Sequence, residues 1–159
     1  MTIDSYYEGS KDTAVTNEKS VIPRFVKSLK LYTETIFSEI CMKDSRSLTK
    51  EDLKKILEAV EKSDSDKIII THGTYTMPDT ARYLQANLKR KDQTIILTGS
   101  MIPLVGFSPS DAPFNLGYSI SKAKDLPEGV YVCMNGRVFS PQEILKTLSE
   151  GRFSSIFNK

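Results

Sequence analysis

The residues best suited to chemistry lie in one short stretch, which runs from Thr71 to Met77 and reads Thr-His-Gly-Thr-Tyr-Thr-Met. It follows the run Lys67–Ile70, whose short length and β-branched residues predict a strand that is buried on both faces. The Met-Pro-Asp sequence that comes next is typical of a helix start, where proline is tolerated and Thr76 can cap the first turn. We therefore expect the hydroxyls of Thr74 and Thr76 and the phenol of Tyr75 between the carboxyl end of a strand and the amino end of a helix.

This position favours a ligand site that accepts an anionic group. Ligands of open parallel sheets bind at the carboxyl ends of the strands, and the backbone N–H groups of a helix start attract anions. A hydroxyl is a poor nucleophile near neutral pH and needs a base, which can be a lysine whose pKa is lowered by burial or by neighbouring charges. His72, the only histidine, is expected to hydrogen-bond to structure at the strand end rather than to act as a base. We also expect Asp111 to cap a helix, Asn115 to brace loops and Arg137 to be a structural or interface cation.

Strands and helices are expected to alternate along the chain. β-Branched and apolar runs predict strands over residues 34–41, 67–71, 94–98 and 130–134. Apolar residues at helical spacing predict helices over residues 21–29, 49–62 and 77–88, from residue 111 onward, and over 141–148, and the spacing of Thr49 and Asp52 is typical of a capping box. Residues 2–20 are expected to form a loop, and the tail after Glu150 is expected to be loosely held. The alternation implies right-handed crossovers and a parallel sheet covered by helices on both faces.

Composition and charge argue against several classes of protein. The chain of 159 residues has a net charge of +2, which is too small to indicate nucleic acid or a membrane surface as a partner, and no apolar stretch approaches the ~20 residues of a membrane span. The polar first residues do not resemble a signal peptide, so we expect the cytoplasm. Cys41 and Cys133 fall in expected strands, where buried free thiols are the simplest interpretation. One histidine and no Cys-x-x-Cys pair argue against a zinc site, and no cofactor or metal is expected.

Four spaced motifs resemble those of bacterial-type L-asparaginases. The stretch from Thr71 to Met77 is similar to the family's His-Gly-Thr-Asp-Thr motif, and the resemblance continues in Leu97–Pro103, Ser110–Leu116 and Met134–Phe139. It covers nearly the whole chain and looks like a short form of the family with only the amino-terminal domain. The resemblance implies a single three-layer αβα domain over residues 1–159, with a mostly parallel sheet. The chain opens Met-Thr-Ile-Asp, as if inside the family's Thr-Gly-Gly-Thr-Ile motif, so the family's first strand is expected to be missing.

The resemblance also implies a reaction. In the family a threonine hydroxyl attacks the side-chain amide of L-asparagine, an acyl-enzyme forms, ammonia leaves, and water then releases aspartate. No metal or cofactor takes part. Matched motif by motif, the implied catalytic residues are Thr2 as the nucleophile and Thr74 and Lys146 as the pair that activates it; the implied substrate-binding residues are Ser45, Tyr75 and Ser100.

Tyr75 is the main departure from the family's motif, which has aspartate at this place. That aspartate pairs with the α-ammonium group of the substrate and joins the threonine–lysine group. A phenol has no charge near neutral pH. Hydrogen bonds to charged groups are worth about 1.5–3 kcal/mol, so the loss of one weakens the interaction at least ~10-fold. Tyrosine is also much larger than aspartate and fills part of the pocket.

Two other functions stay open from the sequence. One is a non-catalytic binding protein that keeps the fold, which Tyr75 and the missing first strand favour. The other is a nucleotide-binding doubly wound domain, although the chain has no Gly-x-Gly-x-x-Gly or phosphate-binding loop. The expected partners are a small amide substrate, L-asparagine by resemblance, and a second copy of the chain in a homodimer, because short chains of this kind need a neighbour to close the site.

Overall fold

A four-stranded sheet lies at the centre of the computed structural model, which describes residues 2–157. Its order is β3 (Lys67–Thr71), β4 (Thr94–Thr98), β5 (Gly129–Met134) and β6 (Arg137–Phe139). The first three strands are parallel, and β6 returns antiparallel to β5 through a turn in which Gly136 has a φ of +74°. The expectations that concern Met1 and the last two residues lie outside the described part of the chain.

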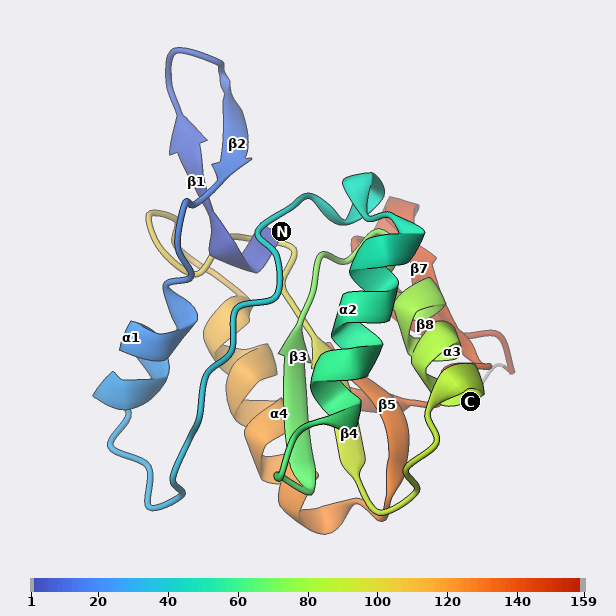
Figure 1. Cartoon of the computed structure of the whole chain (residues 1–159). Coiled ribbons are helices and arrows are strands. Elements are labelled where there is room, and N and C mark those ends of the chain that lie inside the picture. Colours follow the sequence, from blue (N-terminus) through green and yellow to red (C-terminus); the bar gives the residue numbers. More distant parts are fainter. Residues whose placement is uncertain (1, 158–159) are drawn as a thin grey trace.

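Helices cover both faces of this sheet (Figure 1), which confirms the three-layer αβα arrangement. Side chains of each strand alternate between the faces, as the pleat requires. Those on one face join α2 (Lys50–Glu61) and α3 (Met77–Asn87), and those on the other join α4 (Ala112–Asp125). The first set includes Ile68, Ile70, Ile95, Leu97, Val130 and Val132, and the second includes Ile69, Ile96, Tyr131 and Cys133. A further helix, α1 (Ile22–Ser28), packs on the outer side of α4.

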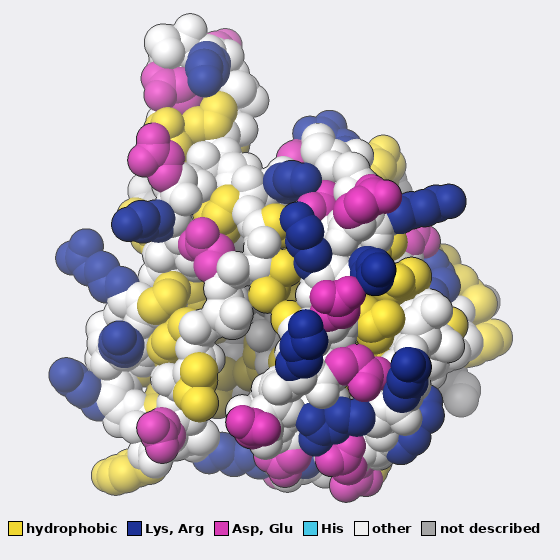
Figure 2. All heavy atoms as spheres, in the orientation of Figure 1, with side chains coloured by type: hydrophobic (Ala, Val, Ile, Leu, Met, Phe, Trp, Pro, Cys, Tyr) yellow, Lys and Arg dark blue, Asp and Glu magenta, His cyan; other side chains and the backbone are white. Residues whose placement is uncertain are grey.

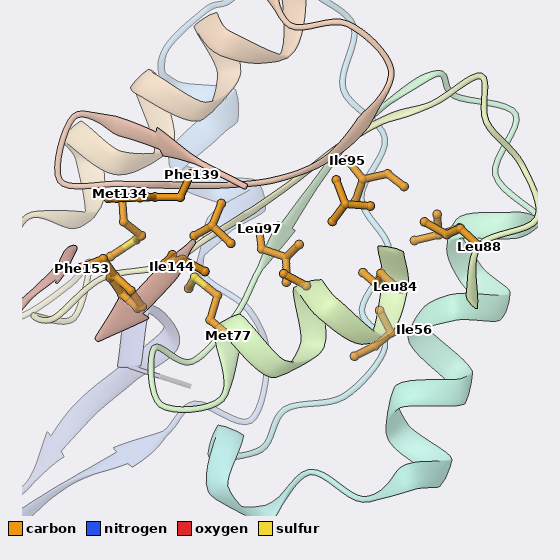
Figure 3. Close-up of a cluster of buried hydrophobic side chains, with 14 residues drawn as sticks. Ile56, Met77, Leu84, Leu88, Ile95, Leu97, Met134, Phe139, Ile144 and Phe153 are labelled. Atoms are coloured by element: carbon orange, nitrogen blue, oxygen red, sulfur yellow. The ribbon is translucent and has the colours of Figure 1, made fainter. Parts of the chain in front are cut away.

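The larger core lies between the sheet and the α2–α3 layer (Figure 3). Met77 and Leu84 of α3 are fully buried there and point toward Leu97 of β4. Ile144 and Phe153, from the carboxyl-terminal part of the chain, close the same core at the end where the site lies. The core therefore ties the start of α3 to the segment that carries Lys146.

Of the three side-chain caps expected at helix starts, one is present and two are not. The expected capping box of α2 is present, because Thr49 Oγ1 accepts from the Asp52 amide at 3.3 Å and Asp52 Oδ2 accepts from the Thr49 amide at 3.0 Å. The expected Thr76 cap is wrong: its hydroxyl donates to the carbonyl of Ser45 at 2.9 Å. The expected Asp111 cap is wrong as well, because its carboxylate accepts from the backbone of the preceding loop instead.

Two expectations for the first forty residues are wrong. Residues 2–20 contain η1 (Thr2–Asp4) and an antiparallel pair, β1 (Ser5–Glu8) with β2 (Thr13–Thr16), rather than a loop. This hairpin projects from the body (Figure 1), and Tyr6 and Tyr7 stay 42% and 52% exposed, so it has no buried face to impose an apolar pattern. Residues 34–41 form no strand, although they are rich in β-formers. A strand needs a neighbour that accepts its backbone hydrogen bonds, and this segment pairs with none in the described chain.

The end of the chain also departs from expectation. Residues 141–148 contain no α-helix: β7 (Ile144–Thr147) pairs antiparallel with β8 (Arg152–Ser155), and the short 3-10 helix η3 (Leu148–Glu150) connects them. The tail up to residue 157 is therefore held in place, with the Phe153 amide donating to Asn135 Oδ1 at 3.0 Å. The pairing and the burial of Ile144 override the local helical spacing.

The sheet is open along the outer edge of β3, which has β4 as its one neighbour among the described strands. Its residues are therefore exposed or half-buried, in contrast to the fully buried β4, and the expectation of burial on both faces is wrong for β3. Figure 2 shows hydrophobic side chains at the surface in the centre and left of this view, whereas α2 on the right carries a mixture of Lys, Arg, Asp and Glu. The exposed apolar side chains of the segment after α1 are Leu29, Leu31, Tyr32, Ile36, Phe37 and Ile40.

The two cysteines lie in different environments. Cys133 is buried in β5, and burial raises the pKa of its thiol to about 12, whereas Cys41 is half-buried outside any strand. No helix within residues 2–157 combines the length and the apolar character needed to cross a bilayer.

Candidate active site

A cavity of about 190 Å³ lies at the carboxyl end of β3, as the motif predicts. It is smaller than the ~300 Å³ at which ligand pockets usually begin, so it suits a molecule of few heavy atoms. Segments from four parts of the chain build it: η1, η2 (Ser45–Ser47) together with the preceding Asp44, the β3–α3 connection and β7. Its lining residues are Thr2, Asp44, Ser45, Arg46, Gly73, Thr74, Tyr75 and Lys146.

The glycine of the motif brings the Ser45 segment against the β3–α3 connection. A Cβ atom at Gly73 would lie 2.7 Å from both Cβ and Oγ of Ser45, which is closer than real carbon atoms approach. Thr76 holds the same segment from the other side through its hydrogen bond to the Ser45 carbonyl. Ser45 is therefore buried and positioned by residues that come 28 and 31 places later in the sequence.

Thr74 and Lys146 meet at the centre of the site. Lys146 Nζ donates to Thr74 Oγ1 at 2.7 Å, across 72 positions of sequence. Thr74 is buried, and Lys146 is half-buried on β7. Burial, and secondarily the positive charge of Arg46, lowers the pKa of Lys146 below its ordinary value. A lowered pKa raises the fraction of neutral amine, which is the form that can accept a proton from a hydroxyl.

Tyr75 lines the cavity and lies close to two cations. The Arg46 guanidinium is 5.8 Å and the Lys146 ammonium 5.7 Å from the centre of its ring. The side chain is 56% exposed and, like Lys146, also lines a second cavity of about 290 Å³. Asp44 in turn accepts from Arg46 Nε at 2.9 Å and Nη2 at 3.0 Å, and these bonds lower the pKa of Asp44 to about 2.

Thr2 reaches the cavity because the residues after it are anchored. Ile3 is fully buried, and its carbonyl accepts from the Leu104 amide at 3.1 Å. Asp4 is also buried and accepts from Ser20 Oγ at 2.6 Å and from the Val21 amide at 2.7 Å. These contacts hold η1 over the end of the sheet, with Thr2 in the lining.

Five of the six residues expected at the site line this one cavity: Thr2, Ser45, Thr74, Tyr75 and Lys146. The sixth, Ser100, is fully buried outside the lining, and its Oγ has no hydrogen-bond partner among the described residues. His72 is buried between the Gly73 carbonyl at 2.7 Å and Thr80 Oγ1 at 3.0 Å, and burial lowers its pKa. It hydrogen-bonds to structure, as expected, and lies outside the lining.

The loop around Ser100 is braced by the two polar residues at the start of α4. Asp111 accepts from the amides of Met101 and Ile102 at distances between 2.9 and 3.1 Å. Asn115 donates to the Gly99 carbonyl at 3.0 Å and accepts from the Asn135 amide at 3.1 Å, which is the bracing role expected for it.

Asp44 and Arg46 were not among the residues expected at the site. Both line the cavity, and Arg46 contacts the ring of Tyr75. Their one signal in the sequence is adjacency to Ser45, which the resemblance had already placed in the pocket. For metals, residues 2–157 contain no group of three or more His, Cys, Asp or Glu side chains that could hold an ion.

Comparisons with known proteins point to one family. The family model "Asparaginase, N-terminal" matches residues 2–156. L-asparaginase 2 of Bacillus subtilis is 36% identical over 98 residues, which cover 59% of this chain and 25% of that protein. The glutaminase-asparaginase of Acinetobacter glutaminasificans is 32% identical over 112 residues, covering 66% of this chain and 33% of that protein. This chain thus spans a quarter to a third of the length of these relatives.

Solved structures extend the likeness to the whole described fold. A protein described as a "probable cytoplasmic L-asparaginase" from Campylobacter jejuni superposes with a TM-score of 0.81 at 25% identity, over 97% of this chain and 50% of that one. The thermostable L-asparaginase from Thermococcus kodakarensis gives 0.79 at 26% identity, over 98% of this chain and 48% of that one. With a family model that matches nearly its whole length, the chain belongs to the asparaginase family, of which it matches the amino-terminal domain.

Proposed function

We propose that this protein is an asparaginase-type amidohydrolase that converts L-asparagine to L-aspartate and ammonia through a threonine nucleophile. The observation that carries the proposal is the contact between Lys146 Nζ and Thr74 Oγ1 in a cavity that Thr2 also lines. Family membership supports the same reaction class. A lysine with a lowered pKa next to a buried hydroxyl is the arrangement that an acyl transfer needs.

In the proposed reaction Thr2 attacks the carbonyl carbon of the side-chain amide. Its proton passes to Thr74, whose own proton goes to the neutral amine of Lys146. Lys146 then protonates the leaving nitrogen, and ammonia departs from a tetrahedral intermediate to leave an ester on Thr2. Water attacks this ester by the same proton path and releases aspartate. Ser45, which lines the cavity, positions the substrate in this proposal, whereas Ser100 lies outside the lining.

The test is ammonia release from L-asparagine by the purified chain and by single variants. Thr2→Val removes the proposed nucleophile and is expected to abolish turnover. Thr74→Val and Lys146→Met remove the proton path and are expected to lower kcat by about 100- to 10,000-fold, the range that general acid–base groups contribute. Thr33→Val and Lys54→Met are matched controls, because both residues are exposed and lie outside the cavity. If turnover persists in Thr2→Val but is lost in Thr74→Val, the nucleophile is Thr74 and not Thr2.

A non-catalytic binding protein is the second candidate, and the position of Tyr75 favours it. The ring lines the cavity and lies close to two cations. A protein that binds small carboxylates at this cavity and releases no ammonia from any amide would fit this candidate and not the first.

Two further features belong to the proposal. We place the protein in the cytoplasm, which a structural relative described as cytoplasmic supports. We also propose a homodimer, supported by exposed apolar side chains beside the second cavity: Leu145 is 37% and Leu148 68% exposed. Light scattering of the purified chain measures its mass in solution, and a monomer at micromolar concentration would contradict the dimer.

A further inference from the structure

We propose that this pocket selects four-carbon amides that carry a carboxylate but no α-ammonium group, such as succinamate, over L-asparagine. The inference rests on the proposed function, because it names the substrate class of the same site. It concerns the charges that surround the ligand rather than the chemistry of the amide.

While Lys146 is protonated, before it acts as the proposed base, the lining of the cavity is cationic overall. Arg46 and Lys146 are its two cationic side chains, and Asp44 is its one anionic side chain. A ligand carboxylate therefore enters a favourable field, whereas an ammonium group enters between two like charges. Unlike charges attract and like charges repel; the side chain of Arg46 is 67% exposed, so solvent weakens its share of both effects.

The single carboxylate of the lining is already engaged. Asp44 Oδ1 accepts from the Arg46 amide at 2.8 Å and from Nε at 2.9 Å, and Oδ2 accepts from Nη2 at 3.0 Å. This bidentate pair balances the charge of Asp44. The remaining terminal nitrogen of Arg46 makes no contact with Asp44, so it can donate to a ligand carboxylate.

Aromatic rings attract cations, so Tyr75 could in principle hold an α-ammonium group. Its ring is already close to the Arg46 and Lys146 cations, at 5.8 and 5.7 Å from its centre. A third cation at the same ring would meet both of them. Tyr75 therefore occupies the space without supplying the anion that an α-ammonium needs.

The second cavity, which Tyr75 and Lys146 also line, offers no alternative. Asp79 is its one carboxylate, and it pairs with Arg82 at 3.1 Å. In the described lining of the two cavities, each carboxylate therefore pairs with an arginine that is close to it in the sequence. The α-ammonium of L-asparagine would therefore find no free carboxylate near Lys146, whereas succinamate has no ammonium group that needs one.

The experiment measures binding of the two reaction products, succinate and L-aspartate, to the purified full chain by calorimetry near neutral pH. Products are used because their binding does not depend on turnover. We expect succinate to bind at least 10-fold more tightly than L-aspartate. Arg46→Gln is expected to weaken succinate binding and to remove most of the preference. Arg90→Gln is the matched control, since Arg90 makes the same bidentate pair with Asp92, at 3.0 and 2.7 Å, and lies outside both cavities.

Each outcome decides the inference. Equal or tighter binding of L-aspartate would overturn it, as would binding of neither product, or a preference for succinate that Arg46→Gln leaves intact while thermal melting shows the variant folded. Ammonia release from succinamate and L-asparagine tests the proposed function separately. A clear succinate preference without ammonia from either amide would overturn the catalytic proposal and leave the selectivity standing.

Discussion

Replacement of Tyr75 by aspartate should raise kcat/KM for L-asparagine. The change removes a ring that lies close to Arg46 and Lys146 and puts a carboxylate in the lining of the cavity. A charged hydrogen bond to the α-ammonium is worth about 1.5–3 kcal/mol, which corresponds to about a 10- to 150-fold increase in kcat/KM for L-asparagine. Because Tyr75 is 56% exposed, the truncation leaves no internal cavity, and the melting temperature should change little.

One effect opposes the gain. A carboxylate beside Lys146 favours the protonated amine and so raises the pKa of Lys146, which reduces the fraction of the proposed base that is neutral near pH 7. The gain in kcat/KM should therefore be larger at about pH 7.5 than at about pH 6, a range in which most of the substrate keeps its α-ammonium charge. The same carboxylate repels the ligand carboxylate, so kcat/KM for succinamate should fall.

The assay is ammonia release from both amides at the two pH values, with two control variants at the same position. Tyr75→Asn has nearly the size of the aspartate variant without its charge, and Tyr75→Phe keeps the ring and removes the hydroxyl. Neither should favour L-asparagine. A rise in the asparagine rate that is equal in Tyr75→Asn and Tyr75→Asp would show that bulk and not charge limits the site, and the electrostatic reasoning would be refuted.

Three other predictions follow from the same geometry. The kcat/KM of the unmodified chain should rise with pH as Lys146 loses its proton, with a midpoint below the ordinary lysine pKa of about 10.4. Arg46→Gln removes a neighbouring cation and should move that midpoint to higher pH, and an unmoved midpoint would contradict Lys146 as the base. Gly99→Ala should lower the melting temperature by several degrees, because the new Cβ would lie 2.3 Å from the His72 carbonyl oxygen, whereas Gly117→Ala in α4, with open space around it, should not lower it. An engineered version with an apolar strand ahead of η1, paired to the open edge of β3, should melt higher, by about 2–4 °C per kcal/mol gained, and equal midpoints would show that this edge needs no partner.

Much of the central architecture was predictable from local sequence. The short β-branched runs at β3, β4 and β5 and the helical periodicity of α2, α3 and α4 each carry their own signal, because a buried strand or an amphipathic helix imposes its period on the residues that form it. The capping box at Thr49 and Asp52 is equally local, since both partners lie within one turn of helix.

The wrong secondary-structure predictions concern segments whose backbone conformation depends on a neighbouring strand. Residues 34–41 have strand-forming residues but no strand to pair with in the described chain, and residues 144–147 have helical spacing but pair with β8. The β1–β2 hairpin shows the converse: it forms without a buried face, so no apolar pattern reveals it. Strand formation depends on a partner strand, and the partner is not encoded in the segment itself.

For the site, the sequence by itself determined the candidate side chains, including the threonine–tyrosine–threonine stretch and the spacing of Lys146, through their resemblance to asparaginase motifs. Only the tertiary structure decided which of them meet. Gly73 lets Ser45 approach, the β7–β8 pair carries Lys146 to Thr74, and the turn at Asp44 places Arg46 beside Tyr75. The physical reason is that these contacts join segments far apart in the chain, and the charge balance of the pocket is a property of that assembly rather than of any one motif.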